Sequence, residues 1–171
     1  MNALSYEREK FFSRLIWLFP LAYVLHITEE SHGFADWVTQ VIGGKMRVSV
    51  FYINNAVFMV ILLTLCTLAS RKQKTWSTFL LFLWTSAQIF WNFVFHIYAE
   101  FSFNAYSPGY FTAIFLYFPV YSYLSYLCLR EHFLSWPLWL TCFVVSWLGM
   151  AFTIWGGLYH FGPIPWDRWM R

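Results

Sequence analysis

Three groups of polar residues in an otherwise apolar chain have the types and spacing needed for chemistry. The first is His26, Glu29 and Glu30, which on an α-helix occupy positions i, i+3 and i+4 and therefore share one face. A carboxylate inside hydrocarbon costs about 2.5 kcal/mol or more, so two adjacent ones need a cation, shared protons or an exit into the headgroups. This group predicts a metal or proton-transfer site, or a helix end in the interface.

The second group is a row of four polar residues, each four positions from the next: Gln88, Asn92, His96 and Glu100. On a helix this spacing forms one narrow polar stripe, and the residues around it are apolar. A stripe of this kind is typical of a membrane helix with a functional face turned inward. Asn92 and His96 suit substrate or ligand orientation, whereas Gln88 alone fits an interhelical hydrogen bond better.

The third group lies at helix ends. Asn54 and Asn55 interrupt an apolar run, and Tyr106 and Ser107 precede the turn signal Pro108-Gly109. Adjacent helical residues point about 100° apart, so we expect Asn54 and Asn55 to serve one site unequally. Asn55 or Asn92 has the amide donor that a developing oxyanion needs.

The composition excludes an ordinary soluble protein. Of 171 residues, 60% are hydrophobic and 11% charged, less than half the roughly 25% charge of soluble domains. Aromatic residues reach 25%, too many for interfacial belts alone, so many must pack between helices or line a cavity. The net charge of +3 is scattered at helix ends. We therefore expect the lipid bilayer and a lipophilic small molecule as partners, and no nucleic acid.

The pattern predicts an all-α fold, a single integral membrane domain over residues 1–171. Five transmembrane helices are expected from runs of about 20 apolar residues, at 15–31, 48–70, 76–101, 110–129 and 137–160. Phe34, Trp37, Val38 and Val41 predict a short amphipathic interfacial helix between the first two spans, ended by Gly43 and Gly44. Three cysteines without a CxxC spacing read as buried small side chains: Cys66, Cys128 and Cys142.

The loop charges predict a cytoplasmic N-terminus and an outside C-terminus. One side holds seven basic residues: Arg8, Lys10, Arg14, Arg71, Lys72, Lys74 and Arg130. The other holds four: Lys45, Arg47, Arg168 and Arg171. At about 1.5 Å per residue, the polar groups of the separate helices all fall in the outer half of the bilayer. We therefore expect one shared site, with the His26 and His96 side chains within roughly 10 Å of each other.

With these motifs in view, the chain resembles the HXXEE-motif integral membrane family. His26 to Glu30 supplies the naming motif. Asn92 and His96 match the family's Asn-Ala-x-x-His motif, with Phe93 in place of Ala, and Tyr106 to Gly109 match the end of its Cys-hydrophobic-x-Tyr-Ser-Pro-Gly motif. Phe103 stands at the Cys position and Asn104 at the hydrophobic one. The resemblance implies a multi-span membrane protein with a suspected active site and no known reaction.

Three hypotheses follow. The first is a metal-dependent membrane enzyme with zinc or iron held by His26, Glu30 and His96. The second is a metal-free acid/base isomerase, cyclase or hydrolase; the Glu pair with Asn-x-x-x-His is also loosely similar to glutamate-dependent intramembrane proteases. The third is a transporter or assembly factor whose polar residues form a structural clamp.

The candidate site residues fall into two groups. The candidate catalytic residues are His26, Glu29, Glu30, Asn92 and His96. The candidate binding residues are Asn54, Asn55, Gln88, Glu100, Tyr106 and Ser107.

Overall fold

The computed structural model describes residues 3–72 and 74–160, which are almost entirely helical and contain no strand. Five helical segments in this part of the chain are long and apolar enough to cross a membrane: Tyr6–Glu30, Val48–Arg71, Thr75–Phe103, Tyr110–Arg130 and Trp136–Gly156. The predicted five-span helical bundle is therefore confirmed.

The first span begins earlier than the sequence predicted. It consists of α1 (Ala3–Leu15) and α2 (Leu18–Glu30), joined by a turn at Ile16 and Trp17. The predicted start at Leu15 was wrong because the charged segment before it is also helical. Its basic side chains are exposed, whereas Phe12 and Ile16 are buried in the core. Pro20 lies in the first turn of α2, where a missing N–H costs no helical hydrogen bond.

Three of the other spans contain π-helical turns that the sequence did not predict. The second span is α4 (Val48–Lys72), and the third joins α5 (Thr75–Thr85), the π-helix η1 (Ser86–Trp91) and α6 (Asn92–Phe103). The fourth joins α7 (Tyr110–Thr112), the π-helix η2 (Ala113–Tyr117) and α8 (Phe118–Arg130). The fifth joins α9 (Trp136–Thr153) and η3 (Ile154–His160).

A short helix, α3 (Phe34–Gln40), follows the first span. Phe34, Trp37 and Val38 are buried against Phe51 and Leu158, so its apolar face covers one end of the bundle. A short helix was predicted here, and its position at the membrane interface stays a prediction. The chain then turns at Gly43, whose φ of 70° lies in the left-handed region.

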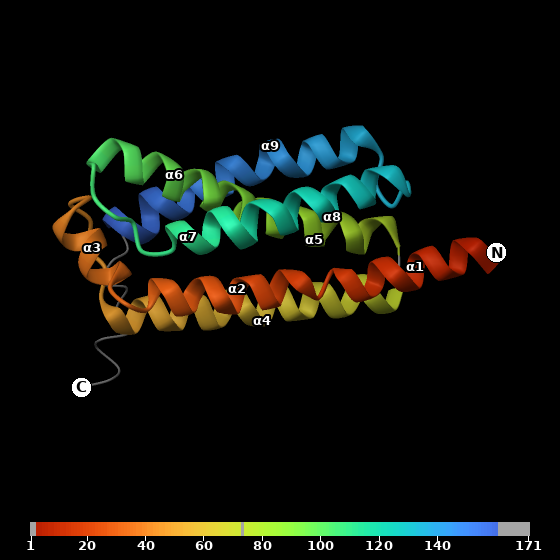
Figure 1. Cartoon of the computed structure of the whole chain (residues 1–171), viewed down its shortest axis with the longest axis horizontal. Helices are drawn as coiled ribbons and strands as arrows, with labels where there is room; N and C mark the ends of the chain where they lie inside the picture. Colours follow the sequence, from red (N-terminus) through yellow and green to blue (C-terminus); the bar gives the residue numbers. More distant parts are fainter. Residues whose placement is uncertain (1–2, 73, 161–171) are drawn as a thin grey trace.

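The spans enclose a main apolar core, and a second apolar cluster lies under α3. In Figure 1, α2 and α4 run side by side along one edge of the bundle, and α5, α6, α8 and α9 lie on the other side. Buried aromatic and aliphatic side chains fill the space between them, including Phe19, Leu62, Phe82 and Tyr121. Cys66, Cys128 and Cys142 are buried and free, as predicted.

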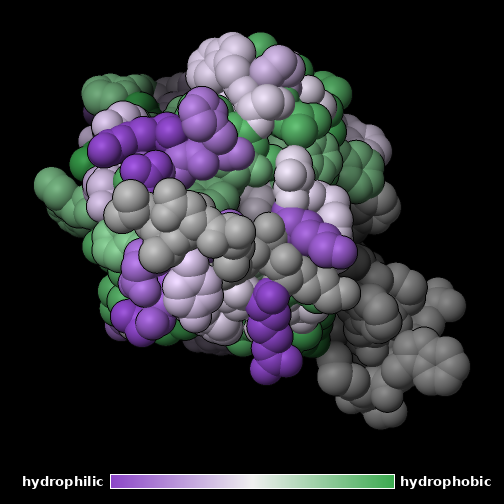
Figure 2. Space-filling model, turned by 90° about the vertical axis from the view of Figure 1, so that its right-hand side faces the viewer, coloured by the Kyte–Doolittle hydropathy of each residue, from purple (hydrophilic) through white to green (hydrophobic). Residues whose placement is uncertain are grey.

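The two ends of the bundle differ in charge. The start of α1 and the α4–α5 and α8–α9 connections lie at one end, and hydrophilic side chains gather there (Figures 1 and 2). Its exposed basic residues are Arg8, Lys10, Arg14, Arg71, Lys74 and Arg130. The opposite end carries α3, the C-terminal end of α2 and the α6–α7 loop (Figure 1). Arg168 and Arg171 lie outside the described residues, so the orientation in the membrane stays a prediction.

Candidate metal centre

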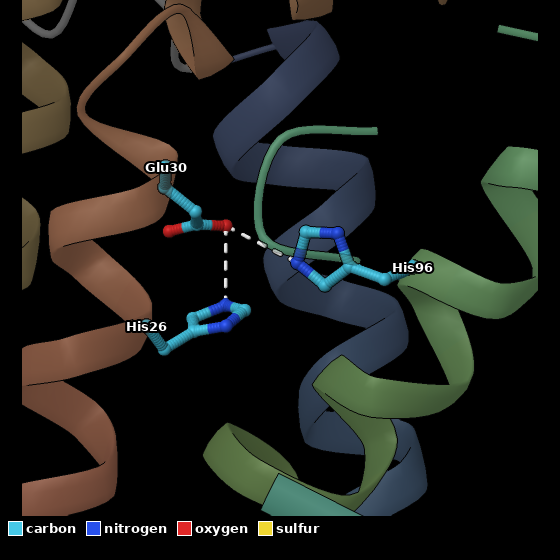
Figure 3. A group of neighbouring side chains, drawn as sticks. All are labelled: His26, Glu30 and His96. Carbon is cyan, nitrogen blue, oxygen red and sulfur yellow. Dashed lines mark ion pairs between the residues drawn. The ribbon is translucent and has the colours of Figure 1, made fainter. Parts of the chain in front are cut away.

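A buried cluster of two histidines and one carboxylate lies toward the end of the bundle that carries α3. His26 and Glu30 project from α2 and His96 from α6, and all three point toward one another (Figure 3). Oε1 of Glu30 lies 3.4 Å from Nε2 of His26 and 3.2 Å from Nε2 of His96. The histidines are 0% exposed and Glu30 is 4% exposed. Their ring centroids are 4.9 Å apart, so the predicted proximity of His26 and His96 is confirmed.

A hydrogen-bond chain fixes the protonation of His26. The Thr112 hydroxyl lies 2.5 Å from Oε2 of Glu29, and a carboxylate can only accept, so the hydroxyl donates to it. Nδ1 of His26 lies 2.9 Å from the same hydroxyl and must be the donor there. The His26 Nδ1 atom therefore carries a proton, and its Nε2 atom faces Glu30. Such support of the outer ring nitrogen is what metal-ligating histidines usually show.

His96 is held in a similar way from the other side. Its Nδ1 atom lies 2.9 Å from the hydroxyl of Ser107, a residue of the α6–α7 loop. The backbone N–H of Ser107 donates to Oε2 of Glu100 at 2.8 Å, which fixes the loop to α6. Glu100 and Ser107 thus orient His96 and do not face the cluster themselves.

The inner side of the cluster lacks a charge-balancing partner. Nε2 of His26 and Nε2 of His96 are buried and have no hydrogen bond in the described part of the chain. A lone pair facing a carboxylate is repulsive unless a cation or a proton lies between them. One ligand atom from each of the three residues lies within 4.8 Å of the others. Tetrahedral zinc, with bonds of about 2.0–2.2 Å, separates its ligands by about 3.3–3.6 Å, close to the two observed distances.

Gly109 closes the cluster by backbone contact. Its φ of 100° lies in the left-handed region, and a Cβ atom here would come within 2.7 Å of His96, 2.8 Å of His26 and 3.0 Å of Glu30. Only glycine satisfies both the conformation and the space. The Pro108-Gly109 pair is thus a turn, as predicted, and is also one wall of the cluster.

Glu29 has a different environment from Glu30. It accepts hydrogen bonds from the Tyr106 hydroxyl at 2.5 Å, from Phe111 N at 3.2 Å and from Thr112 N at 2.8 Å. The carboxylate therefore caps the N-terminus of α7, where the helix dipole favours a negative charge. Burial of its hydroxyl and the hydrogen bond to Glu29 raise the pKa of Tyr106, so the phenol stays protonated and continues to donate.

A small cavity adjoins the cluster at Glu30. It measures about 90 Å³, and its walls are mostly apolar, among them Phe34, Phe51, Phe95 and Met150. Its polar lining includes four predicted residues: Asn54, Asn55, Gln88 and Asn92. Both Asn54 and Asn55 line the cavity, and Oδ1 of Asn55 also accepts a hydrogen bond from the Tyr23 hydroxyl, so that the unequal roles expected for the two residues stay a prediction. The Oδ1 atom of Asn92 is buried and has no hydrogen-bond partner within residues 3–72 and 74–160.

Two further residues belong to this site and were missed in the sequence. Thr112 supports His26, and its only sequence signal is its place three residues after Gly109. Tyr117 lies with its ring centroid 4.1 Å from that of His26, and its buried hydroxyl has no hydrogen-bond partner in the part of the chain that the structure describes. In a run rich in tyrosine and phenylalanine, nothing in the sequence distinguishes Tyr117 from packing residues.

Comparison with known families agrees with this geometry. The family model described as "Protein of unknown function with HXXEE motif" matches residues 17–124, more than half of the chain. The chain belongs to the HXXEE-motif family. The matched region of this HXXEE protein contains the whole cluster and its supporting residues. No curated protein and no solved structure matches the chain.

Proposed function

We propose that this HXXEE protein is a membrane enzyme with a divalent metal centre, acting on a lipophilic substrate. The observation that carries the proposal is the convergence of two buried imidazole Nε2 atoms, neither of them hydrogen-bonded, on one carboxylate oxygen. Two histidines and a carboxylate with an open position suit catalytic zinc, and the same donors suit non-haem iron.

The surroundings of the cluster support a reaction rather than a purely structural metal. Only three protein ligands converge there among the described residues, which leaves a coordination position for water or substrate. A metal in this position would lower the pKa of a bound water and polarise a substrate oxygen, so hydrolysis is the reaction class that we propose. Glu30 belongs to both the cluster and the cavity, so a substrate in the cavity would meet the metal there.

Elemental analysis of the detergent-purified protein tests the proposal. We expect stoichiometric zinc or iron in the wild type and background metal in His96→Gln, since glutamine offers no imidazole nitrogen. His32→Gln is the matched control, because His32 is an exposed histidine near the same end, with Nδ1 2.7 Å from the carbonyl oxygen of Thr28. Wild-type protein that stays free of metal after incubation with zinc and with iron would reject the metal centre.

A metal-free acid/base enzyme is the second candidate, favoured by the same short distances. A proton shared by Glu30, His26 and His96 would also relieve the repulsion in the cluster. A metal-free protein whose turnover is abolished by Glu30→Gln would support it. Full activity of Glu30→Gln would instead favour a transporter or assembly factor in which the cluster is a clamp.

A further inference from the structure

A groove on the surface of the bundle lies next to the cavity beside Glu30. Tyr23, Ile27 and Asn55 line the cavity, and the same three residues line a more open groove of about 360 Å³ between α2 and α4. The groove also contains Val24, Thr28, Tyr52 and Ala56, all exposed along a membrane-spanning segment. These exposed side chains would face lipid, so the groove is a lateral approach from the bilayer.

Two of the three side chains that line both the groove and the cavity are hydrogen-bonded to each other. The Tyr23 hydroxyl donates a 2.6 Å hydrogen bond to Oδ1 of Asn55, which links α2 to α4. Tyr23 is 3% exposed, so this bond lies behind the lipid-facing surface. Rotation of these two side chains would join the two spaces without moving a helix.

The size of the cavity limits what it can hold. Pockets that enclose a whole small-molecule ligand usually measure about 300–1,000 Å³, several times the volume beside Glu30. A lipophilic substrate can therefore place only one end there, and the rest must extend through the groove. A single apolar chain is narrow enough to do so.

The inner end of such a ligand must carry a hydrogen-bond donor. Oδ1 of Asn92, a residue of the cavity wall, is a buried acceptor with no hydrogen-bond partner among the described residues. An unsatisfied buried acceptor is costly, and an O–H or N–H group of a ligand would satisfy it.

We infer that this site takes a single-chain lipid bearing a hydroxyl or amide donor, which enters from the bilayer between α2 and α4. Its donor binds Oδ1 of Asn92, and its chain lies in the groove past Tyr23 and Asn55. The inference rests on the proposed function, because it supplies the substrate of the centre at Glu30.

Photolabelling in phospholipid vesicles with a diazirine-bearing hexadecanol tests the entrance. Ala56→Trp blocks the groove, and Val60→Trp is its matched control on the lipid-facing side of α4, outside the described pockets. We expect labelling of the Asn92–Phe95 segment to fall about tenfold in Ala56→Trp, which corresponds to a loss of about 1.4 kcal/mol of binding free energy. Labelling should stay unchanged in Val60→Trp. Equal labelling of the two variants would overturn the entrance.

A second pair of variants guards against misfolding. Thr28→Trp blocks the same groove from α2, and exposed Leu25 gives its control, Leu25→Trp. Tyr23→Phe removes the hydrogen bond between the two helices and should raise the rate of labelling. Unchanged labelling in both Thr28→Trp and Tyr23→Phe would also overturn the entrance.

The donor requirement is tested with the methyl ether of the same probe. We expect the ether to label the cavity about three- to tenfold less, the effect of one lost hydrogen bond, and Asn92→Leu to remove this difference. Equal labelling by both probes in the wild type would overturn the assigned ligand class. Metal content, measured on the same samples, separates the two proposals. If the protein contains no metal but still binds the alcohol through the groove, the metal-dependent enzyme is rejected and the lipid site is kept.

Discussion

At the scale of single residues, the adjacent carboxylates Glu29 and Glu30 have separate tasks. Glu30 faces two imidazole Nε2 atoms, whereas both oxygens of Glu29 accept hydrogen bonds from Tyr106, Phe111 and Thr112. The sequence alone left open which of the two is functional. The geometry favours Glu30 as a ligand and Glu29 as the residue that positions its surroundings.

Substituting each carboxylate by glutamine should separate these tasks. Glu30→Gln should fold and yet lose the metal, since the charge that balances the cation is gone. Glu29→Gln should still bind metal when the metal is in excess. Its metal affinity should be about 10- to 100-fold lower, because the hydrogen bonds that support His26 are disturbed. It should also lose about 1–3 kcal/mol of unfolding free energy, since its new amide group faces two donors. Metal titration and thermal unfolding measure both effects; equal metal loss in the two variants would contradict this division.

Gly109→Ala tests the contact that closes the cluster. We expect a loss of at least about 1–2 kcal/mol of stability from the left-handed backbone, together with loss of metal, because the added methyl group meets His26 and His96. Gly149→Ala is the control: a Cβ there meets nothing within 4 Å, and alanine in a helix stabilises by about 0.5–1 kcal/mol. Thermal unfolding and elemental analysis give the readouts. A Gly109→Ala protein that keeps its metal would show that the α6–α7 loop can move away from His26 and His96.

The polar residues of the cluster were predictable because helical spacing and the rarity of charges in apolar runs mark them. His26, Glu30 and His96 stand out on these grounds alone. Thr112 and Tyr117 could not be predicted, because their roles depend on how the fourth span docks against α2. The unpartnered Oδ1 of Asn92 is likewise a property of the packed bundle.

At the scale of elements, the π-helical turns decide which side chains reach the site. The π-helix η1 ends directly before Asn92, and η2 ends at Tyr117. A π turn contains one residue more than an α turn and is often found beside functional sites. The sequence predicted the spans from hydropathy, but the i, i+4 periodicity carries no sign of the wider turns.

Deleting one residue from η1 tests its role. Removal of Ala87 should convert the π turn to a regular helix and rotate one half of the span against the other by about 100°. His96 would then leave the cluster, so we expect loss of metal with the helix content preserved. Elemental analysis and far-ultraviolet circular dichroism measure these properties. Retention of full metal content would show that His96 reaches Glu30 without the π turn.

At the scale of the whole molecule, the separation of basic residues from the cluster predicts the topology. Six of the exposed basic side chains gather at one end of the bundle, and the cluster lies toward the other, where Lys45 and Arg47 are the exposed basic residues within the described chain. The excess of Lys and Arg predicts that the first end faces the cytoplasm and that the metal centre lies in the outer half of the bilayer. Tags at the two termini should be accessible from outside only at the C-terminus of intact cells. An accessible N-terminal tag would place the centre in the other leaflet.

The neighbouring positions of Glu29 and Glu30 also have a mechanical consequence. Both residues belong to the last turn of α2. Glu30 contacts His96 of the third span, whereas Glu29 accepts a hydrogen bond from Thr112 at the start of the fourth span. If binding of an ion shifts the last turn of α2 through Glu30, the same shift acts on the hydrogen bonds of Glu29. Binding of an ion in the buried cluster would then stabilise the start of the fourth span. We expect slower amide hydrogen exchange at Phe111 and Thr112 when the ion is bound.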